Sequence, residues 1–264
     1  MSDFSQGVPR NNVILPSSVG MLDSLIGHFS AGSAASSDLE PRVVADLRQQ
    51  LAKGKYFGRD MGELWRMLIQ VLAKAGGVPG SGGEGFRLLN MACGRCEEAA
   101  VLSAFFSRTS TNTRQFALDL RAEEIDKAKR RYAATEAVFK KAGLPGICSS
   151  DGDSIEFVAD DATRLIKYGQ IPSEYEVVFI RHQNLWHDKG VWRRIYEFAL
   201  SRLAAPDGIL IITSYFDREH HLALEVLREL GGVIVTTERN MNSRELDSPG
   251  KSVDRHVAAI RQSA

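Results

Sequence analysis

Short apolar runs of strand length alternate with amphipathic segments of helix length over the last two thirds of the chain. The runs with the strand pattern are Phe86–Asn90, Gln115–Leu118, Ile155–Ala159, Tyr175–Ile180, Gly208–Thr213, Val233–Thr237 and Val253–Ile260. The segments with helical periodicity are Ala99–Phe106, Arg121–Lys141, Lys189–Leu203 and the stretch that carries Ala223, Val226, Leu227 and Leu230. This alternation predicts an α/β fold with a doubly wound, mostly parallel seven-stranded sheet between helices. A polar loop joins the last two runs, so we expect an antiparallel C-terminal hairpin.

The N-terminal third of the chain has a different character. Residues 1–37 are rich in Ser, Gly and Asn, and two helix-like stretches follow them. In these stretches the apolar positions that share a face are first Val44, Leu47 and Leu51, and then Leu64, Met67, Leu68, Val71 and Leu72. The Gly-rich segment 76–85 predicts a flexible linker. We therefore expect a tail and helical cap at 1–75, a linker at 76–85 and the sheet domain at 86–264. The cap is either a mobile lid or a helical layer packed on the sheet.

Composition narrows the classes of partner. The 33 basic and 33 acidic residues balance, so no overall field draws the chain to nucleic acid or to an anionic membrane. The sequence shows no signal-peptide pattern and no apolar run of membrane length. Cys93 and Cys96 form a C-x-x-C pair, but Cys148 is distant, so we expect two small packed side chains rather than a zinc or redox site. These features predict a soluble, cytoplasmic protein without a metal.

The first strand-like run leads through a small-residue turn directly into a helix. Ligands of open α/β sheets bind at the carboxyl ends of the strands, and Gly94 lacks the Cβ that would obstruct a ligand at this turn. A dinucleotide needs the Gly-x-Gly-x-x-Gly spacing and a free helix N-terminus for its pyrophosphate. Glu97 and Glu98 occupy that first helical turn and would repel it. S-adenosylmethionine has no phosphate and carries two positive centres, so the acidic turn suits it. The alternative is an ordinary turn whose carboxylates complement the helix dipole.

At these residues the sequence resembles the class I S-adenosylmethionine-dependent methyltransferases. Their first motif reads acidic-x-Gly-x-Gly-x-Gly, and this chain keeps only the central glycine. The four motif positions are held by Asn90, Ala92, Gly94 and Cys96. The Cys-Gly-x-Cys-Glu-Glu turn is also similar to that of the chemotaxis-receptor glutamate methyltransferases, which implies that Glu97 or Glu98 faces the methionine end of the cofactor. The resemblance implies a Rossmann-like domain that binds S-adenosylmethionine.

Two further strand ends carry candidate cofactor contacts. Asp119 ends the second strand, where adenosine-binding sheets place an acid that accepts both ribose hydroxyls, and Leu120 follows it. The alternative is a plain strand-end or helix-cap aspartate. The resemblance implies that Asp161, before Ala162, hydrogen-bonds the adenine amino group, with Asp160 the weaker candidate. The alternative there is an Asx turn.

Arg181 and His182 begin the loop after the fourth strand, which the resembled fold places beside the transferable methyl. The run Phe179–Lys189 is similar to the Arg-Asn-x-x-x-Tyr-Phe run of the chemotaxis-receptor enzymes, with His182 in place of their Asn. His182 or His187 is a candidate base for a hydroxyl acceptor. A carboxylate acceptor would need only orientation by Arg181, which is also a candidate cofactor contact. The alternative is an unremarkable loop histidine.

The same loop bears on the acceptor. It lacks the Asn/Asp-Pro-Pro-aromatic motif of amino-methylating nucleic-acid enzymes and the Pro-Cys nucleophile used on pyrimidine carbon. We therefore expect an S-adenosylmethionine-dependent methyltransferase that acts on an oxygen, hydroxyl or carboxylate, of a small molecule or protein. The alternative is a non-catalytic descendant that binds the cofactor or a partner protein, favoured by the missing glycines and by Asn90 in place of an acid. A different nucleotide-dependent α/β enzyme is disfavoured by Glu97 and Glu98.

Overall fold

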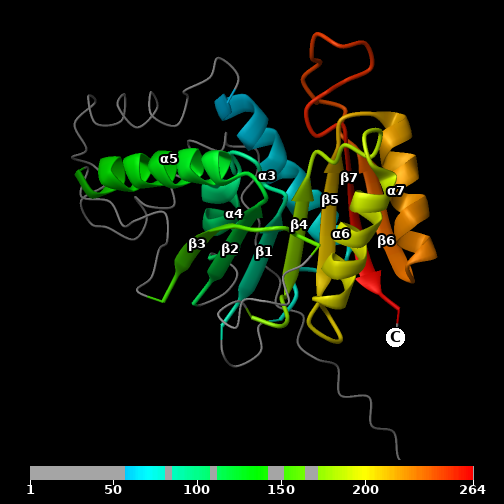
Figure 1. Ribbon diagram of the computed structural model, residues 1–264, viewed down its shortest axis with the longest axis horizontal. Coiled ribbons are helices and arrows are strands. Elements are labelled where there is room, and N and C mark those ends of the chain that lie inside the picture. Colours follow the sequence, from blue (N-terminus) through cyan, green and yellow to red (C-terminus); the bar gives the residue numbers. More distant parts are fainter. Residues whose placement is uncertain (1–56, 81–84, 108–111, 142–151, 164–171, 264) are drawn as a thin grey trace, which may run out of the picture.

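The computed structural model describes residues 57–80, 85–107, 112–141, 152–163 and 172–263 (Figure 1). Its centre is a seven-stranded sheet in the order β3-β2-β1-β4-β5-β7-β6. The strands are β1 (Arg87–Met91), β2 (Arg114–Asp119), β3 (Ser154–Ala159), β4 (Val177–Arg181), β5 (Ile209–Ser214), β6 (Gly232–Arg239) and β7 (His256–Gln262). Strands β1 to β5 are parallel, and β7 lies antiparallel between β5 and β6. The predicted mostly parallel sheet with an antiparallel C-terminal hairpin is confirmed.

Helices cover both faces of this sheet, as Figure 1 shows. They are α3 (Phe57–Lys74), α4 (Ala99–Phe106), α5 (Ala122–Lys141), α6 (Lys189–Ser201) and α7 (Asp217–Glu229). Successive strand residues point to opposite faces. On β4, Phe179 therefore packs with α3 and α4, whereas Ile180 packs with α6 and α7. Because both faces are covered, all five residues of β4 are buried, and the first four, Val177–Ile180, form a continuous apolar run.

Helix α3 forms part of the core. Its Leu64, Leu68 and Val71 have no exposed surface, and they belong to the same apolar cluster as Leu88 and Phe179 of the sheet. The sequence leaves open whether the N-terminal helices form a mobile lid or a layer packed on the sheet. For α3 the structure shows a helix packed on the sheet. The predicted tail at 1–37, the helix-like stretch around Val44 to Leu51 and part of the 76–85 linker lie outside the described residues, so the domain limits stay a prediction.

Two strands start two or more residues later than predicted. Strand β4 begins at Val177, because Tyr175 makes only an isolated bridge to Leu203. Strand β7 begins at His256 instead of Val253. The reason is Asp254, whose φ of 46° lies in the left-handed region and interrupts extended backbone. Within the described residues, no helix is both long enough and apolar enough to cross a bilayer.

Candidate functional site

The carboxyl ends of the parallel strands meet at one edge of the sheet. The chain passes from β1 to β2 and β3 on one side and then returns to β4 on the other side of β1, so the strand order reverses between β1 and β4. Ligands of open α/β sheets bind at such a switch point. The antiparallel pairing of Ser214 with His256 brings the start of β7 to the same edge. The loops 92–98, 182–188, 215–216 and 240–255 therefore all border one region.

A buried ion cluster lies in this region. Arg181 Nη2 donates to Asp254 Oδ2 at 2.6 Å and Nε donates to Oδ1 at 3.0 Å, while Nη1 lies 3.4 Å from Glu98 Oε2. All three side chains are at most 7% exposed. Burial by itself raises the pKa of Asp254, but Arg181 and His182 outweigh it and hold that pKa well below its usual range. Arg181 and Asp254 thus form an ionised, hydrogen-bonded pair, and through Glu98 this cluster ties the turn after β1 to the loop before β7.

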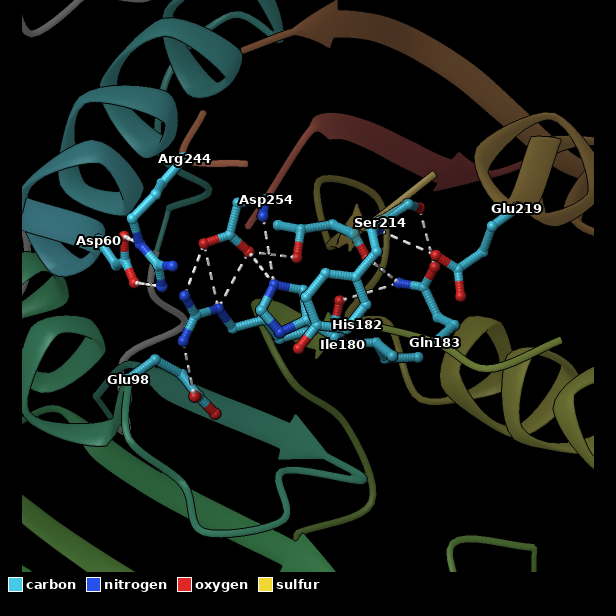
Figure 2. A network of polar contacts seen from close by, with 12 residues as sticks. Asp60, Glu98, Ile180, His182, Gln183, Ser214, Glu219, Arg244 and Asp254 are labelled. Atoms are coloured by element: carbon cyan, nitrogen blue, oxygen red, sulfur yellow. Dashed lines mark hydrogen bonds and ion pairs between the residues drawn. The ribbon is translucent and has the colours of Figure 1, made fainter. Parts of the chain in front are cut away.

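His182 extends this cluster toward solvent. Its Nε2 lies 2.8 Å from Asp254 Oδ1 (Figure 2). Its ring stacks on Tyr215 with centroids 3.8 Å apart. The backbone N–H of Asp254 is also near Nε2, at 3.3 Å, but the shorter contact to an ionised carboxylate favours the tautomer with the proton on Nε2. Nδ1 makes no hydrogen bond to a described residue and has its lone pair available.

Burial lowers the pKa of His182 below its ordinary value of 6.5, although the charge of Asp254 opposes this shift. The imidazole is therefore neutral at pH 7. Thr213 Oγ1 donates to the same Asp254 Oδ1 at 2.7 Å, which helps to hold the carboxylate at Nε2. The φ of His182 is 59°, a left-handed conformation that is uncommon outside glycine and recurs at functional sites. A neutral histidine held by an ionised aspartate is an arrangement that can accept a proton.

The two glutamates of the first helical turn take different directions. Glu98 is 3% exposed and accepts a 2.7 Å hydrogen bond from Asn90 Nδ2 besides its contact with Arg181. Glu97 has a side chain 42% exposed and lies 3.3 Å from Arg131. Asn90 Oδ1 is buried and has no hydrogen-bond partner among the described residues. An unpaired buried acceptor is costly, so this oxygen is available to a donor on a ligand.

The turn after β1 has an unusual backbone. Ala92, Gly94 and Cys96 all have positive φ, at 52°, 56° and 49°. These are the three positions that are glycine in the motif of the resembled family. The backbone therefore keeps the glycine conformation although two of the residues carry a Cβ, at a cost of about 1–2 kcal/mol for each such residue.

Asp119 joins this turn to the end of β2. Its Oδ2 accepts the Gly94 N–H at 2.7 Å, and its Oδ1 accepts from the backbone and the guanidinium of Arg121 at 3.0 and 2.9 Å. The carboxylate is buried, whereas the Arg121 side chain is 64% exposed. Leu120 beside it is 70% exposed, which is unusual for a large apolar residue. The two sequence candidates at this strand end are thus adjacent to the glycine turn.

The residues after β3 give weaker support for a cofactor contact. Asp161 Oδ1 accepts hydrogen bonds from Thr163 N and Oγ1 at 2.9 and 2.7 Å, which is the Asx turn considered from the sequence. Ala162 is buried in the core, and the Asp160 N–H donates to the Asp119 carbonyl at 3.0 Å. His187, the other candidate base, is exposed. The role of Asp161 toward adenine stays a prediction.

Cys93 and Cys96 are buried free thiols within the turn. Burial raises the pKa of Cys96 well above its ordinary value. For Cys93 the hydrogen bond with Cys96 lowers the pKa, but burial and the nearby carboxylates outweigh it and raise the pKa overall. The described residues contain no group of three or more His, Cys, Asp or Glu side chains placed to hold a metal.

Structural comparison relates this arrangement to known proteins. The glycopeptide N-methyltransferase MtfA superposes with a TM-score of 0.50 and 11% sequence identity, over 77% of this chain and 90% of that one. The fold is that of the S-adenosylmethionine-dependent methyltransferases. Magnesium protoporphyrin IX methyltransferase from Synechocystis PCC 6803, solved with bound S-adenosylmethionine, has a TM-score of 0.49 at 13% identity over 94% of this chain and 100% of that one. An S-adenosylmethionine-dependent methyltransferase from Clostridium acetobutylicum ATCC 824 has a TM-score of 0.48 at 9% sequence identity, over 83% of this chain and 98% of that one.

Sequence comparison adds no closer relative of this methyltransferase fold, since no family model and no curated protein matches the chain. The local resemblance to the chemotaxis-receptor enzymes stays a prediction. Sequence reasoning did not find Asp254 and Tyr215, which complete the surroundings of His182. No local motif marks either residue. Asp254 precedes the last strand, and only its left-handed backbone and the sheet order bring it to β4.

Proposed function

We propose that this protein is an S-adenosylmethionine-dependent methyltransferase that acts on a hydroxyl group, with His182 as the general base. The observation that carries the proposal is the His182–Asp254 pair, 2.8 Å apart, at the carboxyl end of β4. The pair lies at the same edge of the sheet as the glycine turn and Asp119. The fold supports the cofactor, and the pair supports the acceptor type.

The residues around the turn after β1 fit S-adenosylmethionine. Asp119 provides a buried carboxylate for the ribose diol, and Leu120 provides exposed apolar surface beside it. Arg121 now uses the same carboxylate, but an ion pair with so exposed a partner contributes at most about 1 kcal/mol, so the guanidinium can move aside. Asn90 Oδ1 and the acidic side chains Glu97 and Glu98 suit the amino-acid end. The bound cofactor supplies a methyl group on a positively charged sulfur.

Residues of the protein would accept the proton that the acceptor hydroxyl loses. His182 Nδ1 accepts the hydroxyl proton while Asp254 holds Nε2–H and stabilises the imidazolium that forms. Thr213 and Arg181 keep Asp254 in place through hydrogen bonds to its carboxylate oxygens. Positioned base catalysis of this kind contributes about 10²- to 10⁴-fold in rate.

The burial of the Arg181 side chain is an argument for a hydroxyl acceptor and against a carboxylate acceptor. Orientation of a carboxylate by Arg181 requires a free guanidinium edge, yet this side chain is buried between Asp254 and Glu98. Displacement of either acid would leave a buried charge without its partner, which costs about 3–5 kcal/mol. We therefore assign Arg181 a positioning role for Asp254 and Glu98. The acceptor hydroxyl belongs to a small molecule or a protein, and Cys93 and Cys96, which form no disulfide in the described part of the chain, agree with a cytoplasmic location.

Two substitutions test the base. We expect His182→Gln and Asp254→Asn to lower kcat by about 10²-fold or more, with the dissociation constant of S-adenosylmethionine within about threefold of that of the wild type. His187→Gln, an exposed histidine of the same loop, is the matched control and should keep full activity.

The wild-type kcat/KM should be flat near neutral pH and fall only below 6.5, because the pKa of His182 is lowered and the protonated ring cannot act as a base. Equal activity of His182→Gln and the control would remove the base assignment. Cofactor binding without transfer to any hydroxyl would favour the non-catalytic alternative.

A further inference from the structure

Two pairs of aromatic rings join the loop after β4 to the loop after β5. His182 stacks on Tyr215 at 3.8 Å with an angle of 16° between the ring planes. Four residues later Trp186 meets Phe216, the neighbour of Tyr215, edge to face at 6.4 Å. The two pairs are linked through the consecutive residues Tyr215 and Phe216, and we call the four residues His182, Tyr215, Trp186 and Phe216 the aromatic wall.

The outer part of this wall is open. Trp186 is 44% exposed, whereas Trp65, in the core layer of α3, is 4% exposed. Large aromatic side chains are normally buried, and they contribute most to binding where they present a flat face to a ligand. An exposed indole four residues from the base indicates a ligand with a ring of its own.

The charges at the wall are positive. The guanidinium of Arg218 lies 5.0 Å from the centroid of Trp186, and the ammonium of Lys251 lies 4.4 Å from that of Tyr215. Neither cation forms an ion pair with a described acidic residue. The charge of Lys251 acts on Glu219, but burial raises the pKa of that carboxyl to about 7, so it carries only part of a negative charge at neutral pH. Three other nearby carboxylates have their own cations. These ion pairs are Asp217 with Arg255, Asp254 with Arg181 and Asp60 with Arg244. The cations beside the rings are therefore available to an anionic group.

We propose that the acceptor is an aromatic hydroxyl compound that carries a carboxylate, with its ring against Trp186 and its carboxylate at Arg218 and Lys251. This inference rests on the proposed function and names its substrate class. A phenol loses its proton near pH 10, so a neutral imidazole removes that proton far more readily than the proton of an aliphatic alcohol. In the transfer, His182 Nδ1 takes the O–H proton and the oxygen lone pair forms the new bond to the methyl carbon. The C–S bonding pair stays on sulfur, which leaves as a neutral thioether, and His182 releases its proton to solvent.

The first test measures binding without turnover. Calorimetry in the presence of S-adenosylhomocysteine uses 4-hydroxybenzoate and 4-hydroxycinnamate as probes. Two analogues lack one feature each: 4-hydroxycyclohexanecarboxylate has no aromatic ring and methyl 4-hydroxybenzoate has no charge. We expect the two probes to bind about tenfold more tightly than either analogue. Equal affinity of the non-aromatic acid would overturn the ring assignment, and equal affinity of the ester would overturn the charge assignment.

Substitutions locate the binding on the wall. Trp186→Ala and Arg218→Met should each weaken 4-hydroxybenzoate binding by about fivefold to tenfold, as expected for one lost stacking or charge contact. Val233→Ala and Arg228→Met are the controls. Val233 is 52% exposed at the opposite edge of the sheet, and Arg228 is exposed in the last turn of the same helix as Arg218. If Trp186→Ala and Arg218→Met leave the affinity for 4-hydroxybenzoate unchanged, the inference is overturned.

Transfer from methyl-labelled S-adenosylmethionine separates this inference from the proposed function. We expect label on the phenolic oxygen of 4-hydroxybenzoate. Label on aliphatic hydroxyls, with no selective binding of the aromatic acids, would overturn the inference and leave the proposed function in place. Selective binding of the aromatic acids without transfer at any pH would refute the proposed function and leave the binding site.

Discussion

The buried side chain of Glu219 should make the free energy of unfolding depend on pH. It lies in the first turn of α7 and is 1% exposed, and its Oε2 accepts the Tyr215 N–H at 2.9 Å. Burial raises its pKa from 4.5 to about 7, although hydrogen bonds from Tyr215 and Phe216 and the charge of Lys251 oppose the shift. The side chain thus holds the backbone of the loop whose Tyr215 ring supports His182.

The pH dependence of stability follows from this difference in pKa. Below pH 4.5 the carboxyl is protonated in the folded and the unfolded state. Between 4.5 and about 7 the unfolded chain loses the proton and the folded chain keeps it, so the free energy of unfolding falls as the pH rises. At about 1.36 kcal/mol per pKa unit, the loss reaches about 3 kcal/mol by pH 8.

Glu219→Gln removes the titration but keeps an acceptor oxygen for Tyr215. We expect the free energy of unfolding of this variant, relative to that of the wild type, to rise by about 3 kcal/mol between pH 4 and pH 8. Urea unfolding followed by tryptophan fluorescence measures it. Glu225→Gln, an exposed glutamate of the same helix, is the control and should show a pH-independent difference. A difference for Glu219→Gln that stays constant to within about 1 kcal/mol over this range would refute the reasoning.

Further predictions concern the cofactor turn. Asp119→Ala should weaken S-adenosylmethionine binding by about 1–3 kcal/mol in calorimetry, and an unchanged affinity would show that β2 does not end at the ribose. Arg121→Ala should leave the affinity unchanged or raise it by up to about fivefold, because its exposed guanidinium shares that carboxylate, whereas a lower affinity would mean that Arg121 itself contacts the cofactor. Ala92→Gly should raise the free energy of unfolding by about 1 kcal/mol, since φ is 52° there, and destabilisation in a thermal melt would contradict the strain. Alanine at both Cys93 and Cys96 should keep cofactor affinity within about tenfold, unless the pair binds zinc that metal analysis would detect.

The alternation of apolar and polar residues determined most of the architecture. Each strand of the sheet overlaps the apolar run that predicted it. The central strands β4 and β5 are buried on both faces and are apolar over most of their length, whereas the edge strands β3 and β6 contain exposed positions. The same reasoning placed Gly94 and Asp119 at neighbouring strand ends, and the structure joins them by a 2.7 Å hydrogen bond. These features are local, or they follow from the rule that parallel strands end at one edge.

The sequence could not decide contacts that depend on how distant segments pack. Glu98 is the buried glutamate and Glu97 the outward one because Arg181, 83 residues later in the chain, lies next to the first helical turn. Asp254 reaches Arg181 across 73 residues, only because β7 inserts between β5 and β6. Periodicity fixes which face a residue occupies, but charge partners are set by strand order. The strand ends that form this edge and His182 as a candidate base could therefore be predicted from the sequence. The contacts with Asp254 and Tyr215, which set His182 apart from His187, became apparent only in the tertiary structure.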